Sequence, residues 1–317
     1  MDTVGEDELQ LRGGGDTKGG TCKRMWEVFP GKNLICCGGR CITGPDPSIF
    51  VFNIVLTFGA LALFYAFIAI RLHPIVIVIG FILHGISFYF LLRAAFTDPG
   101  ILRRRKTPTR ANENGDPPTA VVNGKTVQLS YCTTCNIYRP PKCKHCRTCD
   151  NCVEEFDHHC PWVMNCVAKR NYRYFVGFVA SISLLCVYVC ACSIAIVVIS
   201  VTGNRQPAGV TLCAIVLILF TGCLGVTLSG FACFHCGLIA QGITTNEYIK
   251  GRAGGARETG CSQYPKNCYE VYCTELPKPD VNLMGPADEE MRDRGGSDEK
   301  MVDLEVRAGG DKDAEIS

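Results

Sequence analysis

Cysteine and histidine side chains are concentrated in one short stretch of this 317-residue chain. Between Cys132 and Cys166 the chain places eight cysteines among three histidines, many of them separated by two residues. Thiolates and imidazoles at this spacing are the ligands that a tetrahedral zinc ion takes from a tight turn. The stretch therefore holds enough ligands for two four-coordinate zinc sites, with some side chains left over.

Bound metal would also explain how this stretch folds. It contains few large apolar side chains, so burial alone cannot hold its backbone, whereas a structural zinc ion contributes on the order of 10 kcal/mol of folding free energy. We do not expect a secreted disulfide scaffold, because the first 48 residues contain no apolar signal-peptide core and the clustered cysteines are interleaved with histidines, as in metal sites. We expect the metals to fix the backbone and a surplus side chain to carry the chemistry.

Cys160 is the best candidate for that surplus side chain, although the spacing of the cysteines alone does not identify it. Asp157, His158 and His159 precede it directly, so a base and a group that orients the base lie within one turn. A thiol beside an imidazole and a bound dication becomes a nucleophile near neutral pH. Cys160 also lies 15 residues before Phe175, where a long apolar segment begins, so it should sit near a membrane surface.

Four segments of the chain are long and apolar enough to cross a bilayer, which takes about 20 apolar residues at a rise of 1.5 Å each. They are Ile49 to Ile70, Ile75 to Leu92, Phe175 to Val201 and Val210 to Ile243. The 32 basic and 30 acidic side chains nearly balance, which excludes a strongly basic nucleic-acid binder and an acidic disordered chain. The sequence predicts an α-helical, four-span membrane protein.

The basic residues predict its orientation. Residues 97–174 contain 13 basic residues, whereas each short loop within a helical hairpin contains one. Positively charged segments stay on the cytosolic side, so the central loop and both termini should be cytosolic.

The predicted regions are a partly disordered N-terminal segment (1–48), spans 1 and 2 (49–96), the cysteine-rich zinc domain (97–174), spans 3 and 4 (175–243), a C-terminal segment (244–280) and an acidic disordered tail (281–317). A short β-hairpin is expected from Ala120 to Val127 around an Asn-Gly pair.

The stretch from Cys132 to Phe175 resembles the cysteine-rich domain of the DHHC protein S-acyltransferases, or palmitoyltransferases. The resemblance rests on Arg139-Pro140, His145-Cys146, Asp157-His158-His159-Cys160, Trp162-Val163, Asn165-Cys166, Asn171 and Phe175. It extends to Asp98-Pro99-Gly100 and to Thr244-Thr245-Asn246-Glu247, and covers about 250 residues. The segments Trp26 to Gly31 and Lys266 to Val271 are similar to the branch that acylates Ras-type GTPases.

The resemblance implies a role for each matching residue. Cys160 would be the acylated nucleophile, His158 its general base and Asp157 the group that orients His158. Thr245 would pack near the active site, and Asn267 would brace the C-terminal segment against the spans. One zinc ion would be held by Cys132, Cys135, His145 and Cys152, and the other by Cys146, Cys149, His159 and Cys166.

The chain departs from the family pattern at four positions. Met164 and Ala168 stand where the branch usually has glycine, Lys142 replaces a common arginine, and Cys143 is an additional thiol. A side chain in place of glycine is harmless unless the backbone there needs a positive φ. All implied ligand and catalytic positions remain intact.

The implied reaction transfers a palmitoyl group from palmitoyl-CoA to protein cysteines, with the acyl chain in a cavity between the four helices. From charge alone, Lys142, Lys144 and Arg147 are candidates to bind the CoA phosphates, and a solvated basic face explains them equally well.

Ras-like GTPases as substrates, a small accessory subunit, and residence in Golgi or ER membranes follow from the resemblance only. Outside the cysteine cluster, Cys36, Cys37, Cys268 and Cys273 are cytosolic cysteines that could themselves be S-acylated.

Two other classes of function compete with this interpretation. A membrane-anchored zinc scaffold or RING-like ubiquitin ligase needs the eight ligands but no reactive thiol, so Cys160 would be dispensable. A channel or transporter is disfavoured, because the predicted spans contain only Asn53, His84, Arg93 and His235 as notable polar groups. We interpret the two histidines as interfacial or helix-packing residues.

Overall fold

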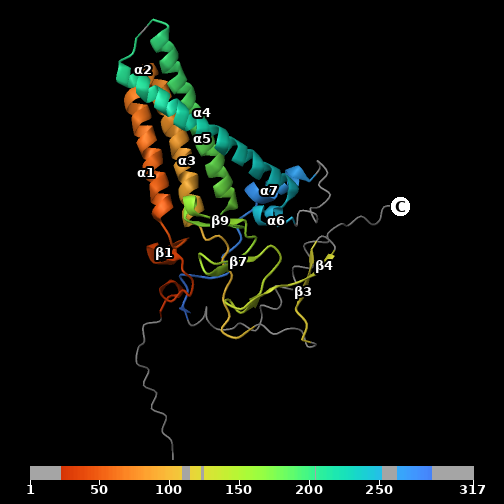
Figure 1. Ribbon diagram of the computed structural model, residues 1–317. Helices are drawn as coiled ribbons and strands as arrows, with labels where there is room; N and C mark the ends of the chain where they lie inside the picture. The colour runs from red at the N-terminus through yellow and green to blue at the C-terminus, as the bar shows by residue number, and fades with distance from the viewer. Residues whose placement is uncertain (1–22, 109–114, 123–124, 204, 252–262, 288–317) are drawn as a thin grey trace, which may run out of the picture.

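The structure is a computed structural model that describes residues 23–108, 115–122, 125–203, 205–251 and 263–287. Most of the N-terminal stretch predicted to be disordered, and the acidic tail after residue 287, lie outside these residues. The described part of the chain has four helices long and apolar enough to cross a membrane. Figure 1 shows the long helices packed together, with the described part of the cysteine-rich region (97–174) at one end of them.

The four helices correspond to the four predicted membrane spans, which confirms the fold class. The first span comprises α1 (Ser48–Leu63), a π-helical turn η3 (Phe64–Ala69) and α2 (Ile70–Leu72). The others are α3 (Pro74–Phe96), α4 (Tyr172–Val201) and α5 (Ala208–Gln241). Their lengths, 23 to 34 residues, and mean hydropathies of 2.2 to 2.8 suit a bilayer.

The ends of the helices follow from local sequence. Pro74 begins α3, where a missing N–H costs nothing, and the His73 Nδ1 caps it by accepting the Ile75 N–H. This helix runs four residues beyond the predicted Leu92 and ends before the Asp98-Pro99 pair. Helix α5 ends at Gln241, two residues before the predicted Ile243, because Gly242 adopts a left-handed φ of 65°.

The helices carry large apolar side chains on their outer faces as well as between them. Val55, Leu219 and Val226 are 64, 69 and 78% exposed, whereas Phe64 and Ile196 are completely buried inside the bundle. A helix bundle that is apolar on both sides would be insoluble in water but is stable in lipid. We conclude that the chain is a multi-pass membrane protein.

Outside the bundle the chain forms short antiparallel hairpins and single 3-10 turns. The predicted hairpin is confirmed, since Ala120 pairs with Val127; its Asn-Gly tip lies outside the described residues. The paired strands are β1 (Leu34–Cys36) with β2 (Cys41–Thr43), β3 (Thr119–Val122) with β4 (Lys125–Gln128), β5 (Tyr131–Cys132) with β6 (Ile137–Tyr138), β7 (Lys144–Cys146) with β8 (Asn151–Val153), and β9 (His158–Cys160) with β10 (Asn165–Val167). The 3-10 turns are η1 (Met25–Glu27), η2 (Cys37–Gly39) and η4 (Pro161–Val163).

Two fully buried asparagines fasten the cysteine-rich region to the end of α3. The Asn165 Nδ2 donates hydrogen bonds to the carbonyls of Ala95 and Thr97, at 3.0 and 3.1 Å. The Asn171 Nδ2 donates to the Ala94 carbonyl at 3.0 Å, just before α4 begins. The last carbonyls of a helix have no partner within it, so these amides satisfy them and fix β10 directly beside the bundle.

The two ends of the described chain are hydrogen-bonded to each other and pack on the cysteine-rich region. The Met25 and Trp26 N–H groups donate to the carbonyls of Gly285 and Leu283, and Leu283 packs in the same apolar cluster as Met25. We predicted a solvated tail from residue 281 onward, and for residues 281–287 this is wrong. Val281, Leu283 and Ala287 are at most 9% exposed. Val281 and Leu283 are buried because they pack against Met25 in an apolar cluster of the cysteine-rich region.

The segment after α5 returns to the cysteine-rich region as two short helices, α6 (Thr245–Ile249) and α7 (Tyr264–Tyr272). Thr244 and Glu247 form a capping box that begins α6. The buried Asn267 of α7 donates its Nδ2 hydrogen to the Ala240 carbonyl at 2.8 Å, as the bracing role predicted for it requires. Figure 1 shows α6 and α7 together below the end of α5.

Candidate active site and metal-binding clusters

The structure gathers the eight predicted ligands into two separate groups. Within each group the ligand atoms all lie within 4.8 Å of one another. In the first, the His145 Nδ1 lies 3.6 to 3.8 Å from the Sγ atoms of Cys132, Cys135 and Cys152. In the second, the His159 Nδ1 lies 3.5 to 3.8 Å from those of Cys146, Cys149 and Cys166.

Strand geometry explains how the β7–β8 hairpin serves both groups. His145 and Cys152 are register partners and point to the same face, so both enter the first group. Cys146, the next residue of β7, points to the opposite face and enters the second group. The two groups are therefore linked through one hairpin, and each can hold a metal ion with three thiolates and one imidazole.

The electrostatics of the groups favour a bound cation. Hydrogen bonds to the Cys146 and Cys149 thiols, together with burial, raise the pKa of Cys166 well above its ordinary value. Similarly, the contact with Cys152 and burial raise the pKa of Cys135. Thiols packed so closely can ionise together only when a cation compensates their charge. In the first group, the His145 Nε2 also lies 3.4 Å from an Asp150 carboxylate oxygen, the usual outer partner of a ligating histidine.

The β9 strand places a possible metal ligand and the predicted catalytic side chains on opposite faces. Side chains alternate along a strand. His159, paired with Cys166, therefore faces the second metal group, while His158 and Cys160 share the other face. A metal that fixes His159 thereby fixes the positions of the two residues that flank it.

His158 is held by a buried carboxylate. Its Nδ1 lies 2.6 Å from the Oδ2 of Asp157, whose Oδ1 accepts the Thr245 N–H at 2.7 Å. Burial alone would raise the pKa of Asp157, but these hydrogen bonds keep it below its ordinary value. Burial alone would lower the pKa of His158, but hydrogen bonds to Asp157 and Cys160 raise it to about 9. The arrangement therefore stabilises an imidazolium beside the Cys160 thiol.

A second histidine lies next to this centre. The ring of His235 is completely buried, 6.3 Å from that of His158 and 5.2 Å from that of Phe175, between centroids. Its Nδ1 is hydrogen-bonded to the Tyr172 hydroxyl at 3.0 Å. The sequence predicts an interfacial or helix-packing role for His235, and its ring does pack against Phe175. Its position ten residues before Thr245, near the end of the last span, is the signal that would have placed it beside the active site.

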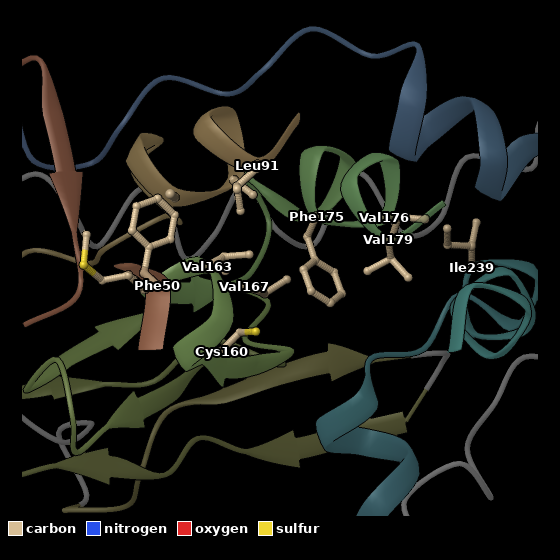
Figure 2. Close-up of a cluster of buried hydrophobic side chains, with 12 residues drawn as sticks. Phe50, Leu91, Cys160, Val163, Val167, Phe175, Val176, Val179 and Ile239 are labelled. Atoms are coloured by element: carbon tan, nitrogen blue, oxygen red, sulfur yellow. The ribbon is translucent and has the colours of Figure 1, made fainter. Parts of the chain in front are cut away.

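Cys160 opens onto a cavity of about 600 Å³ between the helices. Figure 2 shows Cys160 on its strand close to Val167 and Phe175, at the level where α3 and α4 approach the cysteine-rich region. The cavity continues away from Cys160 between α1, α4 and α5 as far as Leu61, Val189 and Phe220. Its lining is predominantly apolar, so it suits a long hydrocarbon chain.

The three basic residues that were predicted to bind CoA differ in their surroundings. The Lys142 Nζ donates to the Gly242 carbonyl at 2.9 Å and lies 3.7 Å from the Glu247 carboxylate. The Lys144 Nζ donates to Asn246 at 3.3 Å. Both lysines thus tie β7 and the residues before it to the segment after α5, whereas Arg147 is exposed.

The departures from glycine are not equivalent. Met164 adopts a φ of 51°, a conformation that favours glycine, whereas Ala168 does not have a positive φ. A left-handed conformation costs an L-residue roughly 1–2 kcal/mol. At Met164 this left-handed conformation is stabilised by two hydrogen bonds, which the Met164 carbonyl accepts from the Thr43 hydroxyl and the Gly44 N–H.

Comparison with known proteins gives matches that cover most of the chain. Residues 125–252 match the family described as DHHC palmitoyltransferase. Human "Palmitoyltransferase ZDHHC9" is 38% identical over 285 residues, covering 80% of this chain and 77% of the relative. Its zebrafish (Danio rerio) counterpart is 40% identical, covering 79% and 72%. Rat (Rattus norvegicus) "Palmitoyltransferase ZDHHC18" is 37% identical, covering 83% and 75%.

The Asp157–His158 contact makes a prediction about the reactivity of Cys160. Removing the carboxylate in Asp157→Asn should lower the pKa of His158 and so weaken the imidazolium that stabilises the thiolate. A decrease of one unit in the pKa of His158 corresponds to an about tenfold larger acid dissociation constant of its imidazolium. We expect alkylation of Cys160 by iodoacetamide at pH 7 to slow by about tenfold or more, with the difference shrinking toward pH 10. Peptide mass spectrometry measures the rate at Cys160 alone.

Asp46→Asn is the control, because the Asp46 carboxylate accepts the Ser48 N–H at the start of α1 and does not contact His158. It should alkylate like the wild type at every pH. Equal rates for Asp157→Asn and the wild type at pH 7 would show that Asp157 does not determine the protonation of His158.

Proposed function

The chain belongs to the DHHC palmitoyltransferase family, and we propose that it transfers palmitoyl groups from acyl-CoA to protein cysteine thiols through an acyl-enzyme on Cys160. The chain is thus a protein-cysteine S-palmitoyltransferase. The observation that carries the proposal is the placement of Cys160 between the Asp157–His158 pair and the mouth of the apolar cavity. This is the only place among the described residues where a cysteine, a histidine held by a carboxylate, and the cavity meet.

The reaction needs two steps. The Nδ1 of His158 is engaged by Asp157, so its Nε2 takes the proton of the Cys160 thiol. The thiolate attacks the carbonyl carbon of the acyl-CoA thioester, the bond to the CoA sulfur breaks, and the CoA sulfur takes the proton back from the His158 Nε2, so that CoA leaves as a thiol. The thiolate of a substrate cysteine then attacks the new thioester in the same way, and its acylation regenerates Cys160. One thioester replaces another in each step, so no external energy source is required.

The two groups of three cysteines and one histidine fit zinc, which prefers four thiolate and imidazole ligands in structural sites. Bound zinc would supply cross-links and positive charge to a region that has little core of its own. The side chains of Cys132, Cys135, His145 and Cys152 would hold one ion, and those of Cys146, Cys149, His159 and Cys166 the other. Proton transfer and nucleophilic attack are left to His158 and Cys160, which belong to neither group.

The cavity is the proposed binding site of the acyl chain. Along α4 its lining runs from Phe175 to Val189, a distance of about 21 Å at a rise of 1.5 Å per residue. This is close to the length of an extended palmitoyl chain. At the other end, the polar CoA head would remain outside the bundle, where Arg147 is exposed and Lys142 and Lys144 approach the segment after α5.

Substrates would meet the acyl-enzyme at the cytosolic membrane surface, because Cys160 lies at the end of the bundle that carries the basic residues. Proteins with juxtamembrane cysteines, Ras-like GTPases among them, fit this position. A small accessory subunit and residence in the Golgi or ER remain expectations from the resemblance to the Ras-acylating branch. S-acylation of Cys268 and Cys273 is likewise a proposal, supported by their positions on and directly after α7.

The direct test is formation and turnover of the acyl-enzyme. Detergent-purified wild type is incubated with alkyne-tagged palmitoyl-CoA, and label removable by hydroxylamine is mapped by mass spectrometry. We expect label at Cys160 together with CoA release, and chase of the label onto a peptide that contains a juxtamembrane cysteine. Cys160→Ala should lose both label and CoA release.

A matched control is Cys143→Ala, since Cys143 lies in the same region but belongs to neither ligand group nor to the cavity lining. It should retain labelling at Cys160. Undiminished label and CoA release in Cys160→Ala would refute the proposed nucleophile and favour the zinc scaffold or ubiquitin ligase.

The cavity predicts which chain lengths are accepted. Val189 is 3% exposed and lines the end of the cavity far from Cys160, so Val189→Phe should shorten the space available. We expect this variant to prefer lauroyl- or myristoyl-CoA over palmitoyl-CoA, because overpacking a filled site costs about 1–3 kcal/mol. Competition between tagged acyl-CoAs of different length, read as label on Cys160, measures the preference.

Val187→Phe is the matched control, since Val187 lies on the same helix but is 50% exposed on its outer face. It should keep the wild-type preference. If Val189→Phe also kept it, the acyl chain would not extend into this cavity.

A further inference from the structure

The β1–β2 hairpin carries a third group of cysteines, which the transferase mechanism does not use. The Sγ atoms of Cys36, Cys37 and Cys41 lie within 4.8 Å of one another, the same limit that encloses each of the two groups described above. Cys36 and Cys41 are register partners on neighbouring strands. Their side chains therefore start from adjacent backbone positions on one face of the hairpin.

The turn of the hairpin brings the third thiol to this pair. Cys37, Gly38 and Gly39 follow one another with φ values of 53, 63 and 91°, all in the region that favours glycine. Two glycines adopt such a conformation at little cost, whereas Cys37 does so against its own preference. The chain thus curls at the tip of the hairpin, and the Cys37 thiol joins the cross-strand pair instead of pointing away from it.

The chemistry of the group identifies the ligand. Among the described residues no fourth cysteine, histidine or carboxylate joins the three thiols within this distance. Structural zinc sites use four protein ligands, whereas a soft monovalent ion such as Cu(I) selects thiolates and is satisfied by three of them. We propose that Cys36, Cys37 and Cys41 form a binding site for one Cu(I) ion.

The surroundings suit such a site. Cys36 and Cys37 are exposed and Cys41 is half-buried, so an ion or a copper donor can reach them directly. Three thiolates and one Cu(I) carry a net charge of −2, which remains in contact with water, and the neighbouring Arg40 is a cation in the same turn.

The site is also connected to the active site by the hairpin itself. Ile42 is 2% exposed, and Thr43 and Gly44 donate hydrogen bonds to the carbonyl of Met164, four residues after Cys160. Cu(I) would cross-link the tip of the β1–β2 hairpin. The end of the same hairpin, at Thr43 and Gly44, is hydrogen-bonded to the turn at Met164. The site is nevertheless separate from the reaction, because none of its three cysteines lines the cavity or contacts His158.

The test is copper binding by the zinc-loaded full-length protein. Wild type and Cys41→Ser are titrated anaerobically with Cu(I) in competition with bathocuproine disulfonate, and both copper and zinc are counted per chain. We expect wild type to bind one Cu(I) more than Cys41→Ser without losing zinc, and X-ray absorption should show three sulfur ligands. Cys41→Ser should retain wild-type labelling of Cys160, because Cys41 has no part in acyl transfer.

Cys273→Ser is the control, because it removes an exposed thiol that belongs to no group, and it should bind copper like the wild type. Equal copper in wild type and Cys41→Ser, or copper uptake only in exchange for zinc, would overturn the proposal. So would peptide mapping that found the purified wild type fully blocked by a Cys36–Cys41 disulfide or by acyl groups on Cys36 and Cys37. The copper and zinc counts do not depend on transferase activity, so failure here leaves the proposed function untouched.

Discussion

The convergence of three cysteines and one histidine in each of two groups, which metal ions would cross-link, is the constraint on which the rest of the structure depends. The cysteine-rich region consists of two- to four-residue strands that bury little apolar surface, so its backbone needs another source of stability. The β7–β8 hairpin contributes to both groups, and β9 contributes His159 to the second. Because strand side chains alternate, fixing His159 also aims His158 and Cys160 at the bundle.

The membrane helices complete the site from the other side. Buried Asn165 and Asn171 tie the end of α3 to β10, and the segment after α5 returns to place the Thr245 N–H on Asp157. His158 and Cys160 thus lie between a region with two groups of possible metal ligands and an apolar cavity. In the proposed mechanism this arrangement would bring a charged nucleophile and a hydrocarbon chain together, where neither water nor lipid alone would accommodate both.

Much of this arrangement could be predicted from sequence, because metal ligands and membrane spans leave strong local patterns. The spacing of the cysteines indicated two metal sites, and apolar length located four spans to within a few residues. Contacts between distant segments left no such pattern. The burial of Val281 and Leu283 against Met25, the position of His235 beside His158, and the convergence of Cys36, Cys37 and Cys41 all depend on tertiary packing.

The central claim is that the metal ions hold the site while Cys160 performs the chemistry. The measurement that tests it most directly is zinc content per chain, by elemental analysis, in Cys160→Ser and Cys166→Ser. Our account predicts that Cys160→Ser keeps the zinc content of the wild type and loses acylation. Cys166→Ser should lose one zinc ion and, with it, acylation at Cys160. Loss of zinc from Cys160→Ser would instead make Cys160 a metal ligand and contradict the account.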